Sequence, residues 1–293
     1  MNEFHDSALV LLGHGSTLNA ESSVPTLRHA AELRRRGIFG QVVTGFWKEH
    51  PFFCGVLRSV FTPRVFIVPL FISEGYFTEE VIPRELGLAG LGQLGFPRVQ
   101  RRCERTFHYC GPVGTHPSMT AVILSRARGI VEGSPNPPAP AETSLFIAGH
   151  GTGNNENSRR AIEDQVLLIR KMGVYHDVHP VFMEEDPRIQ EVHHLAETPN
   201  AVVVPFFISD GLHSFEDIPV MLGAPPDAVQ ERLRRGEPTW INPTVIQDRR
   251  IWYTRSIGDE PHIPDVVVER VRESALLAAV ETPGEVPGMR LVA

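Results

Sequence analysis

The sequence predicts an α/β protein made of two tandem, related halves, each a parallel sheet with helices against it. The first observation behind this prediction is an internal repeat: the segment Gly13-His14-Gly15 recurs as Gly149-His150-Gly151, and Pro83 recurs as Pro219. Both pairs keep one offset (150 − 14 = 136 and 219 − 83 = 136). The second observation is that short apolar runs alternate with helical patterns in each copy, as they do in βαβ units.

The elements of the first half follow from its apolar runs and its helix signals. Strands are expected at residues 8–12, 41–47, 64–72 and 105–110. Helices are expected at residues 25–36, 51–60, 78–86 and 117–131. Pro25 and Gly37 mark the ends of the first helix, because proline suits the first helical positions and glycine ends a helix.

The second half repeats this order. Its strands are expected at residues 144–148, 177–183, 201–208 and 249–254, and its helices at residues 156–172, 188–196, 215–222 and 263–279. By Tyr109 and Tyr253 the offset has grown to 144 (253 − 109 = 144). The second copy therefore carries 8 additional residues (144 − 136 = 8), which fall in the Pro- and Arg-rich stretch 223–240.

The domain boundaries are set by a proline-rich segment. Residues 132–143 contain four prolines and can hold neither a regular helix nor a central strand, so they are expected to be the linker. This divides the chain into a first half at 1–131, a second half at 144–281 and a C-terminal tail at 282–293.

Composition narrows the classes of function. The chain has 293 residues and a net charge of −7, without a basic run dense enough to follow a phosphate backbone, so nucleic-acid binding is not expected. No apolar stretch approaches the roughly 18 residues of a membrane span, and the N-terminus lacks a leader pattern, so we expect a cytoplasmic protein that does not use a membrane. The 3 cysteines form no C-x-x-C pair, which argues against a disulfide framework.

Three groups that suit a divalent transition metal follow the first three strands of the second half: His150, Glu184 and His213. The carboxyl ends of parallel strands meet at one edge of a sheet, where ligands bind. Two imidazoles and one carboxylate with an open position favour Co, Fe, Ni or Zn over Mg or Ca. Taken singly, His150 also fits a packed Gly-His-Gly turn, and Glu184 also fits a solvated acidic run.

The corresponding residues of the first half are His14, Lys48 and Phe77. A structural requirement of the fold should hold in both copies, yet only the first of these positions is retained. The comparison therefore indicates that the second half carries the metal ligands. Lys48 either faces the same cleft and attracts a substrate carboxylate, or points into solvent.

The motifs resemble those of the class II chelatases, the CbiX or sirohydrochlorin chelatase family. They are the Gly-His-Gly turn after the first strand, Phe182-Met183-Glu184 after the second, and P-F-F-I-x-x-G-x-H-x-x-x-D-I-P from Pro205 to Pro219 after the third. The similarity covers about residues 7–131 and 144–275. It implies two flavodoxin-like, chelatase-like halves, related by a pseudo-two-fold axis, that hold a tetrapyrrole in a cleft between them.

The resemblance also implies a chemistry and a set of site residues. His150 and His213 become metal ligands and Glu184 the acidic helper, whereas many two-domain relatives keep the histidine pair in the first half. The implied reaction inserts a divalent metal, Co²⁺ before Fe²⁺ or Ni²⁺, into sirohydrochlorin for cobalamin or siroheme synthesis. The metal is a substrate and no organic cofactor is expected.

The remaining expectations concern the substrate side and the alternatives. His14 and Lys48, with Ser16 and Thr152 at expected helix N-termini, are the candidates for binding the tetrapyrrole and its carboxylates. The partners are then the tetrapyrrole and the metal ion, and a monomer with internal symmetry is expected. The alternative is a metal or tetrapyrrole carrier without catalytic activity, which repeated turnover would distinguish.

Overall fold

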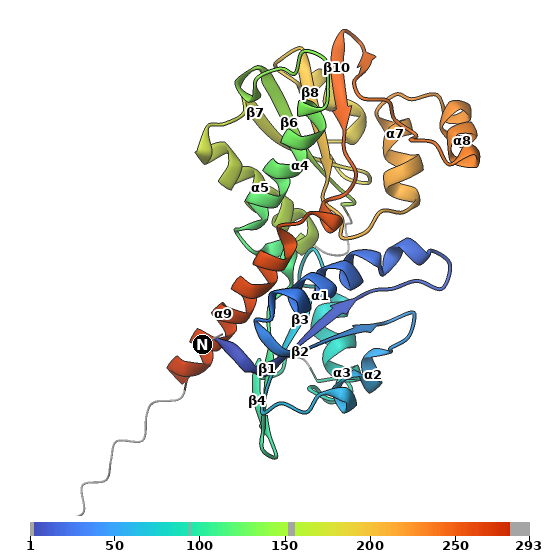
Figure 1. Ribbon diagram of the computed structural model, residues 1–293. Helices are drawn as coiled ribbons and strands as arrows, with labels where there is room; N and C mark the ends of the chain where they lie inside the picture. The colour runs from blue at the N-terminus through green and yellow to red at the C-terminus, as the bar shows by residue number, and fades with distance from the viewer. Residues whose placement is uncertain (1–2, 94, 152–155, 282–293) are drawn as a thin grey trace, which may run out of the picture.

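The computed structural model describes residues 3–93, 95–151 and 156–281, which form two lobes joined along one side (Figure 1). Each lobe is built around its own five-stranded sheet. None of the helices within these ranges is both long and apolar enough to span a lipid bilayer. The tail expected at 282–293 lies outside the described residues.

The two sheets have the same strand order. The first runs β2 (Phe39–Phe46), β1 (Phe4–Gly13), β3 (Arg64–Pro69), β5 (Arg105–Tyr109), β4 (Val99–Arg102). The second runs β7 (Asp177–Phe182), β6 (Thr143–Gly149), β8 (Asn200–Pro205), β10 (Arg249–Tyr253), β9 (Thr244–Ile246). Matching β1 with β6 superimposes one order on the other, which confirms the prediction of two related α/β halves.

The edge strands β4 and β9 correct the prediction of purely parallel sheets. Each pairs antiparallel with the strand that follows it, β5 or β10. Both are short and partly exposed, so neither contains the apolar run that identified the other strands. An edge strand needs no such run, because one side of it faces solvent rather than a neighbouring strand.

The central strand β1 shows why the parallel strands were recognised from sequence. Successive side chains point to opposite faces of a sheet, so Leu9 and Leu11 enter one apolar cluster while Val10 and Leu12 enter another. Helices cover both faces, so the strand is apolar and buried from Ala8 to Leu12. The cluster on the first of these faces also contains Leu145 of β6 and is therefore continuous between the lobes.

The helices differ from the predicted ones mainly in length. They are α1 (Val24–Arg36), α2 (Phe53–Val56), α3 (Ile82–Glu85), α4 (Met119–Glu132), α5 (Glu156–Met172), α6 (Val192–Leu195), α7 (Ile218–Met221), α8 (Pro226–Arg235) and α9 (Ile263–Glu281). The helix expected from residue 51 begins at Phe53, after a cis His50–Pro51 peptide bond. Helix α8 was not predicted and lies in the 223–240 insertion.

In each half, the segment after the third parallel strand, β3 or β8, contains a π-helical turn followed by a short helix. The turns are η3 (Phe77–Val81) before α3 and η7 (His213–Asp217) before α7. Sequence patterns indicated ordinary helices at 78–86 and 215–222. The wider turn at the start of each segment places residue 77 or 213 at its first position, which is where the two halves differ chemically.

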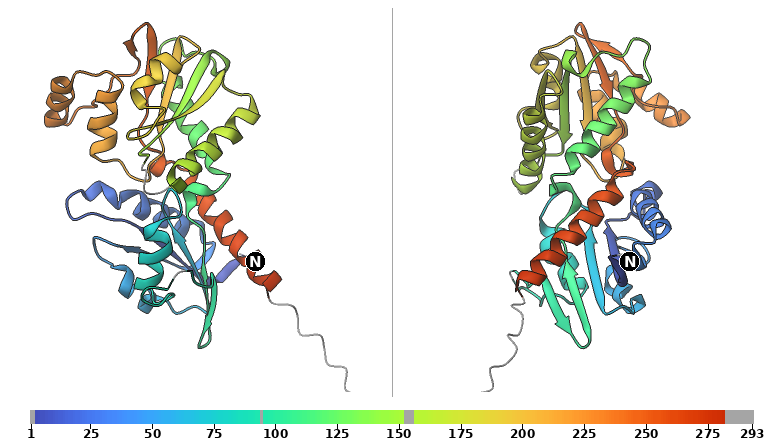
Figure 2. Two further views of the ribbon diagram at one scale, coloured as in Figure 1. Left: turned by 180° about the vertical axis from the view of Figure 1, so that it is seen from behind. Right: turned by 60° about the vertical axis from the view of Figure 1, so that its left-hand side comes forward.

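Helices α4 and α9 are exchanged between the lobes. We expected each to close its own half, but α4 contacts β8 and β10 of the second sheet, and α9 contacts β3 and β5 of the first. Figures 1 and 2 show α9 leaving the second lobe and running along the first. The exchange ties the lobes together and holds the carboxyl ends of both sheets against a common space.

Candidate functional site

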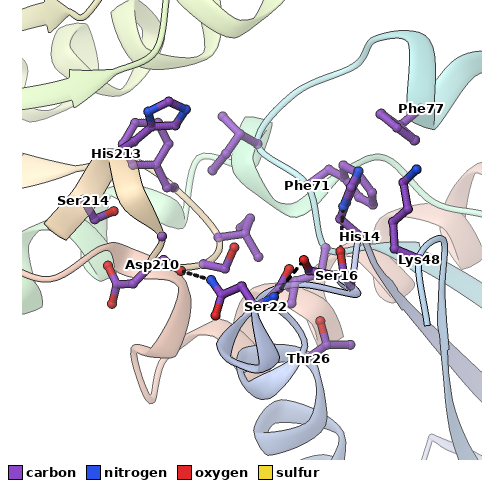
Figure 3. Close-up of a pocket in the computed structure, with 18 of the residues that line it drawn as sticks. His14, Ser16, Ser22, Thr26, Lys48, Phe71, Phe77, Asp210, His213 and Ser214 are labelled. Atoms are coloured by element: carbon purple, nitrogen blue, oxygen red, sulfur yellow. Dashed lines mark hydrogen bonds between the residues drawn. The ribbon is translucent and has the colours of Figure 1, made fainter. Parts of the chain in front are cut away.

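A cleft of about 960 Å³ lies between the two lobes, at the carboxyl ends of the central strands. The first half contributes His14, Ser16, Lys48, Phe71, Tyr76 and Phe77, among others, and the second half contributes Ile208, Asp210 and His213. Figure 3 shows His213 on one side of the cleft and His14, Lys48 and Phe77 on the other. The volume of the cleft is at the upper end of the range for pockets that bury a whole small molecule.

The Gly-His-Gly turn sets both histidines at strand ends. Gly15 and Gly151 follow them with φ angles of +67° and +68°, a left-handed conformation that side chains rarely adopt. A Cβ atom on Gly151 would also come within 3.0 Å of the Phe182 side chain. The motif is therefore retained in both halves for the turn itself, whatever each histidine does.

In each half, the loop after the second strand is hydrogen-bonded to the histidine of the Gly-His-Gly turn. The backbone N–H of Glu184 donates to the carbonyl oxygen of His150 over 3.0 Å, and that of Lys48 donates to the carbonyl oxygen of His14 over 3.1 Å. These bonds bring residue 184 or 48 beside the histidine. Two strand ends that are distant in sequence are thus joined as predicted.

The rings of His150 and His213 are in contact, with centroids 5.0 Å apart and planes at 80°. Nδ1 of His150 lies 3.0 Å from the Gly151 carbonyl oxygen, and Nδ1 of His213 lies 2.7 Å from Oδ2 of Asp217. Both partners can only accept, so in each neutral ring the proton is on Nδ1 and the lone pair on Nε2. The pair therefore presents two imidazole nitrogens that can bind a metal.

Glu184 lies beside His150 rather than in a preformed cage. Its Oε2 is 3.7 Å from Nδ1 of His150, and its side chain is 60% exposed. Within the described ranges, no group of three or more His, Cys, Asp and Glu side chains is already arranged around a metal-sized space. The two histidine rings are already in contact, and Glu184 is an exposed carboxylate beside His150.

The first half reproduces this geometry with different chemistry. The rings of His14 and Phe77 have centroids 5.0 Å apart and planes at 75°, which is the arrangement of His150 and His213. Lys48 is exposed, lines the cleft, and has its Nζ 5.9 Å from the centre of the Trp47 ring. The scaffold is therefore the same, while a phenyl ring and an ammonium replace an imidazole and a carboxylate.

Of the two hydroxyl residues predicted to bind the substrate, Ser16 is described by the structure and Thr152 is not. Ser16 lines the cleft, but its Oγ accepts the backbone N–H groups of Leu18 and Asn19, each over 3.1 Å. No helix begins at Ser16, because the next helical elements are a 3-10 turn at Ala20–Ser22 and α1 from Val24, so the prediction of a helix N-terminus at Ser16 is wrong. Thr152 lies outside the described residues.

Asp210 is a cleft residue that sequence reasoning missed. Its carboxylate is buried, accepting from Nε of Arg255 and from the backbone N–H of Ser256, both over 2.9 Å. Its carbonyl oxygen accepts from Nδ2 of Asn19 in the other lobe over 3.3 Å. Because its partners lie 45 residues or more away along the chain, no local pattern could reveal it.

A cleft between two repeated α/β halves, lined on one side by His213, whose ring contacts that of His150, defines a two-domain chelatase-like protein. The CbiX family profile matches residues 8–130 and 144–274. A Halobacterium salinarum protein named probable sirohydrochlorin cobaltochelatase is 43% identical over 277 residues, 91% of each chain. The chain belongs to the CbiX family, as its motifs indicated.

Two further relatives agree with this assignment. A Methanopyrus kandleri protein named sirohydrochlorin cobaltochelatase is 31% identical over 138 residues, which are 45% of this chain and 96% of that protein. The crystal structure of a multi-domain Deinococcus radiodurans protein, described as similar to chelatases, superposes with a TM-score of 0.73 at 31% identity. It covers 90% of this chain, and this chain spans 54% of that longer protein.

Proposed function

We propose that this protein is an enzyme that inserts a divalent metal ion, Co²⁺ before Fe²⁺, into sirohydrochlorin. The observation that carries the proposal is the contact between His150 and His213, in which an acceptor beside each Nδ1 leaves the lone pair of each neutral ring on Nε2. His213 lines a cleft large enough for a macrocycle, and the His150 ring is in contact with that of His213. The name of the 43% identical relative supports the substrate and the preference for cobalt.

The metal enters on the second half. Nε2 of His150 and Nε2 of His213 are its first ligands, and the exposed carboxylate of Glu184 swings in as the third. Such a set leaves coordination positions for water and then for the pyrrole nitrogens, and it suits Co²⁺, Fe²⁺ or Ni²⁺. The metal is consumed as a substrate, and the reaction needs no organic cofactor.

The two pyrrole protons are accepted by groups of the second half, on the same side of the cleft as the metal. Insertion of one M²⁺ releases two pyrrole N–H protons, so the net charge of the metal is balanced by the protons lost. As the metal passes to the pyrrole nitrogens, the two imidazoles regain their free lone pairs and, with Glu184, become the nearest bases. A group that alternates between ligand and base in this way needs a proton affinity near neutral pH, which is the ordinary property of histidine.

The first half holds the substrate. Lys48 lines the cleft opposite His213 and is suited to a peripheral carboxylate of the tetrapyrrole, while His14 faces the same space. Ser16 remains a candidate hydroxyl contact, as does Thr152, which lies outside the described residues. Because one chain supplies both walls of the cleft, we propose a monomeric working unit, acting in the cytoplasm in cobalamin or siroheme synthesis.

The test is a turnover assay with purified protein, metal-free sirohydrochlorin and Co²⁺, followed by the change in the visible spectrum of the macrocycle. We expect many equivalents of product per chain, and a lower kcat/KM with Fe²⁺ and Ni²⁺. One equivalent or less per chain, with tight binding of either substrate, would instead identify a carrier. The Phe61→Leu variant is a control, because Phe61 is 79% exposed and is not among the cleft residues.

A further inference from the structure

The rings on the first-half wall form a connected group centred on Phe77. The Phe77 ring centroid lies 5.0 Å from that of His14, 5.8 Å from Tyr76, 6.0 Å from Phe71 and 6.2 Å from Trp47. The Phe71 and Phe77 rings are nearly parallel, at 24°. We call these five residues the Phe77 cluster.

The cluster is open to the cleft rather than enclosed as a core. Phe71, Tyr76 and Phe77 all line the cleft, and Tyr76 is 59% exposed. Phe71 and Trp47 reach back to the buried cluster of the first half, which holds them in place. The result is an anchored aromatic surface with one side uncovered.

The second half carries no equivalent surface, although its backbone is the same. At the positions of Trp47, Tyr76 and Phe77 it has Met183, Leu212 and His213, although Phe71 has an aromatic counterpart in Phe207, which also lines the cleft. Aromatic rings required by the fold would be expected in both copies. The presence of Trp47, Tyr76 and Phe77 on one wall alone points to a ligand that this wall has to hold.

The charge beside the cluster narrows the chemistry of that ligand. Nζ of Lys48 is 5.9 Å from the centre of the Trp47 ring, so an ammonium borders the aromatic surface. Opposite it, His213 lines the same cleft (Figure 3). A flat conjugated ring with carboxylates at its rim meets the aromatic surface with its face and the ammonium with its edge.

We infer that the Phe77 cluster is the platform on which the tetrapyrrole stacks, so that the macrocycle binds in one orientation with a single face turned toward His150 and His213. This inference rests on the proposed function and deepens it. The first half is then the substrate-binding wall of an asymmetric site, in which Phe77 contributes affinity for a planar conjugated ring. Metal is delivered from the opposite side only.

The experiment measures binding and catalysis separately. Metal-free sirohydrochlorin is titrated by fluorescence quenching, Co²⁺ by calorimetry, and insertion by steady-state kinetics. In Phe77→Leu we expect the Kd and KM for sirohydrochlorin to rise about 3- to 10-fold, the size of a lost aromatic contact. The Kd for Co²⁺ should change less than twofold, and Phe77→Tyr should restore the KM.

Matched variants keep the result interpretable. Phe61→Leu makes the same chemical change on the surface away from the cleft and should behave as wild type. Because Tyr76 is 59% exposed, Tyr76→Leu serves if Phe77→Leu does not fold, and it should also raise the KM. A folded Phe77→Leu or Tyr76→Leu protein with wild-type KM and Kd overturns the platform.

Two outcomes separate this inference from the proposed function. If wild-type protein neither binds nor metallates sirohydrochlorin, the proposed function itself fails. If wild type is active and the double variant Lys48→Glu/Phe77→His inserts metal faster than wild type, the first-half wall is a former metal site and not a platform. The platform predicts that this double variant loses affinity for sirohydrochlorin.

Discussion

His213 donates its Nδ1 proton to Oδ2 of Asp217, 2.7 Å away and four residues further along the same π-helical turn. The first half has Phe77 and Val81 at these positions, so the ring and its acceptor are both replaced there. A carboxylate behind an imidazole fixes the ring orientation and the tautomer. We therefore expect Asp217 to be a positioning residue that keeps the lone pair of His213 on Nε2, the nitrogen proposed to bind the metal.

The Asp217 carboxylate can be tested by graded substitution. We expect Asp217→Ala to raise the Kd for Co²⁺ by about 10-fold, since loss of such a partner typically costs 10- to 100-fold in metal affinity. Asp217→Asn keeps an acceptor for Nδ1 and should lie between Ala and wild type. Calorimetric titration with Co²⁺ measures both, and equal affinities in all three proteins would exclude the positioning role.

The histidines His14, His150 and His213 should not be equivalent. His150→Ala and His213→Ala are expected to abolish metal insertion, because each removes one nitrogen of the preformed pair. His14→Ala should be milder, since its neighbours are Phe77 and Lys48. The measurement is kcat/KM for Co²⁺ insertion, and inactivation by His14→Ala alone would reverse the assignment of the working half.

Lys48 provides a test of charge on the substrate wall. A unit-charge pair at about 4 Å is worth roughly 1–4 kcal/mol near a protein surface. Lys48→Glu should therefore raise the KM for the polycarboxylate substrate about 10-fold or more, with Lys48→Ala in between. The Kd for Co²⁺ should change little. A KM that stays at the wild-type value in both variants would remove Lys48 from the site.

Two buried tyrosines hold the π-helical turns and form a matched pair. The Tyr253 hydroxyl donates to the Ser214 carbonyl oxygen over 2.7 Å, and the Tyr109 hydroxyl donates to that of Thr78 over 2.6 Å. Burial raises the pKa of both phenols well above the ordinary value, so they remain protonated donors. Each Tyr→Phe change should cost about 1–3 kcal/mol by leaving a buried carbonyl unsatisfied.

The functional effects of this pair should differ. Tyr253→Phe loosens the turn that carries His213 and should weaken Co²⁺ binding. Tyr109→Phe loosens the turn that carries Phe77 and should raise the KM for the tetrapyrrole. Thermal unfolding, Co²⁺ titration and kinetics on both variants check this, and identical functional profiles would contradict it.

His29 makes the lobe interface sensitive to acid. Its Nε2 donates to the Gly258 carbonyl oxygen over 2.6 Å. Burial lowers the pKa of His29; repulsion by Arg28 and Arg36 acts in the same direction, while the Gly258 hydrogen bond and Asp259 oppose it. The unfolded chain therefore binds a proton more readily, so this contribution to stability is present above about pH 6.5 and is lost as the pH falls below it.

The repeat supplies the control for His29. Gln165 occupies the corresponding position (165 − 29 = 136) and donates from Nε2 to the His116 carbonyl oxygen over 3.1 Å. His29→Gln should therefore keep the bond without a titrating ring. We expect its melting temperature to fall less than that of wild type between pH 7.5 and pH 5.5, and an equal fall in both proteins would assign the acid sensitivity elsewhere.

The repeat, the central strands and the strand-end histidines were all determined by the sequence itself. Fully buried parallel strands must be apolar throughout, and the Gly-His-Gly turn depends on local backbone conformation, so both leave signals within a few residues. The comparison of the two halves likewise exposed the replacement of His213 by Phe77. These features did not require knowledge of how distant segments pack.

Tertiary structure alone decided the rest. The apolar faces of α4 and α9 suit either sheet, so only packing assigned each to the opposite lobe. The edge strands β4 and β9 lack an apolar run, and the free nitrogen of His150 or His213 depends on which acceptor lies beside Nδ1. The burial of Asp210 and the place of Lys48 on the cleft wall likewise arise from contacts between segments far apart in the chain, which no local pattern of residues encodes.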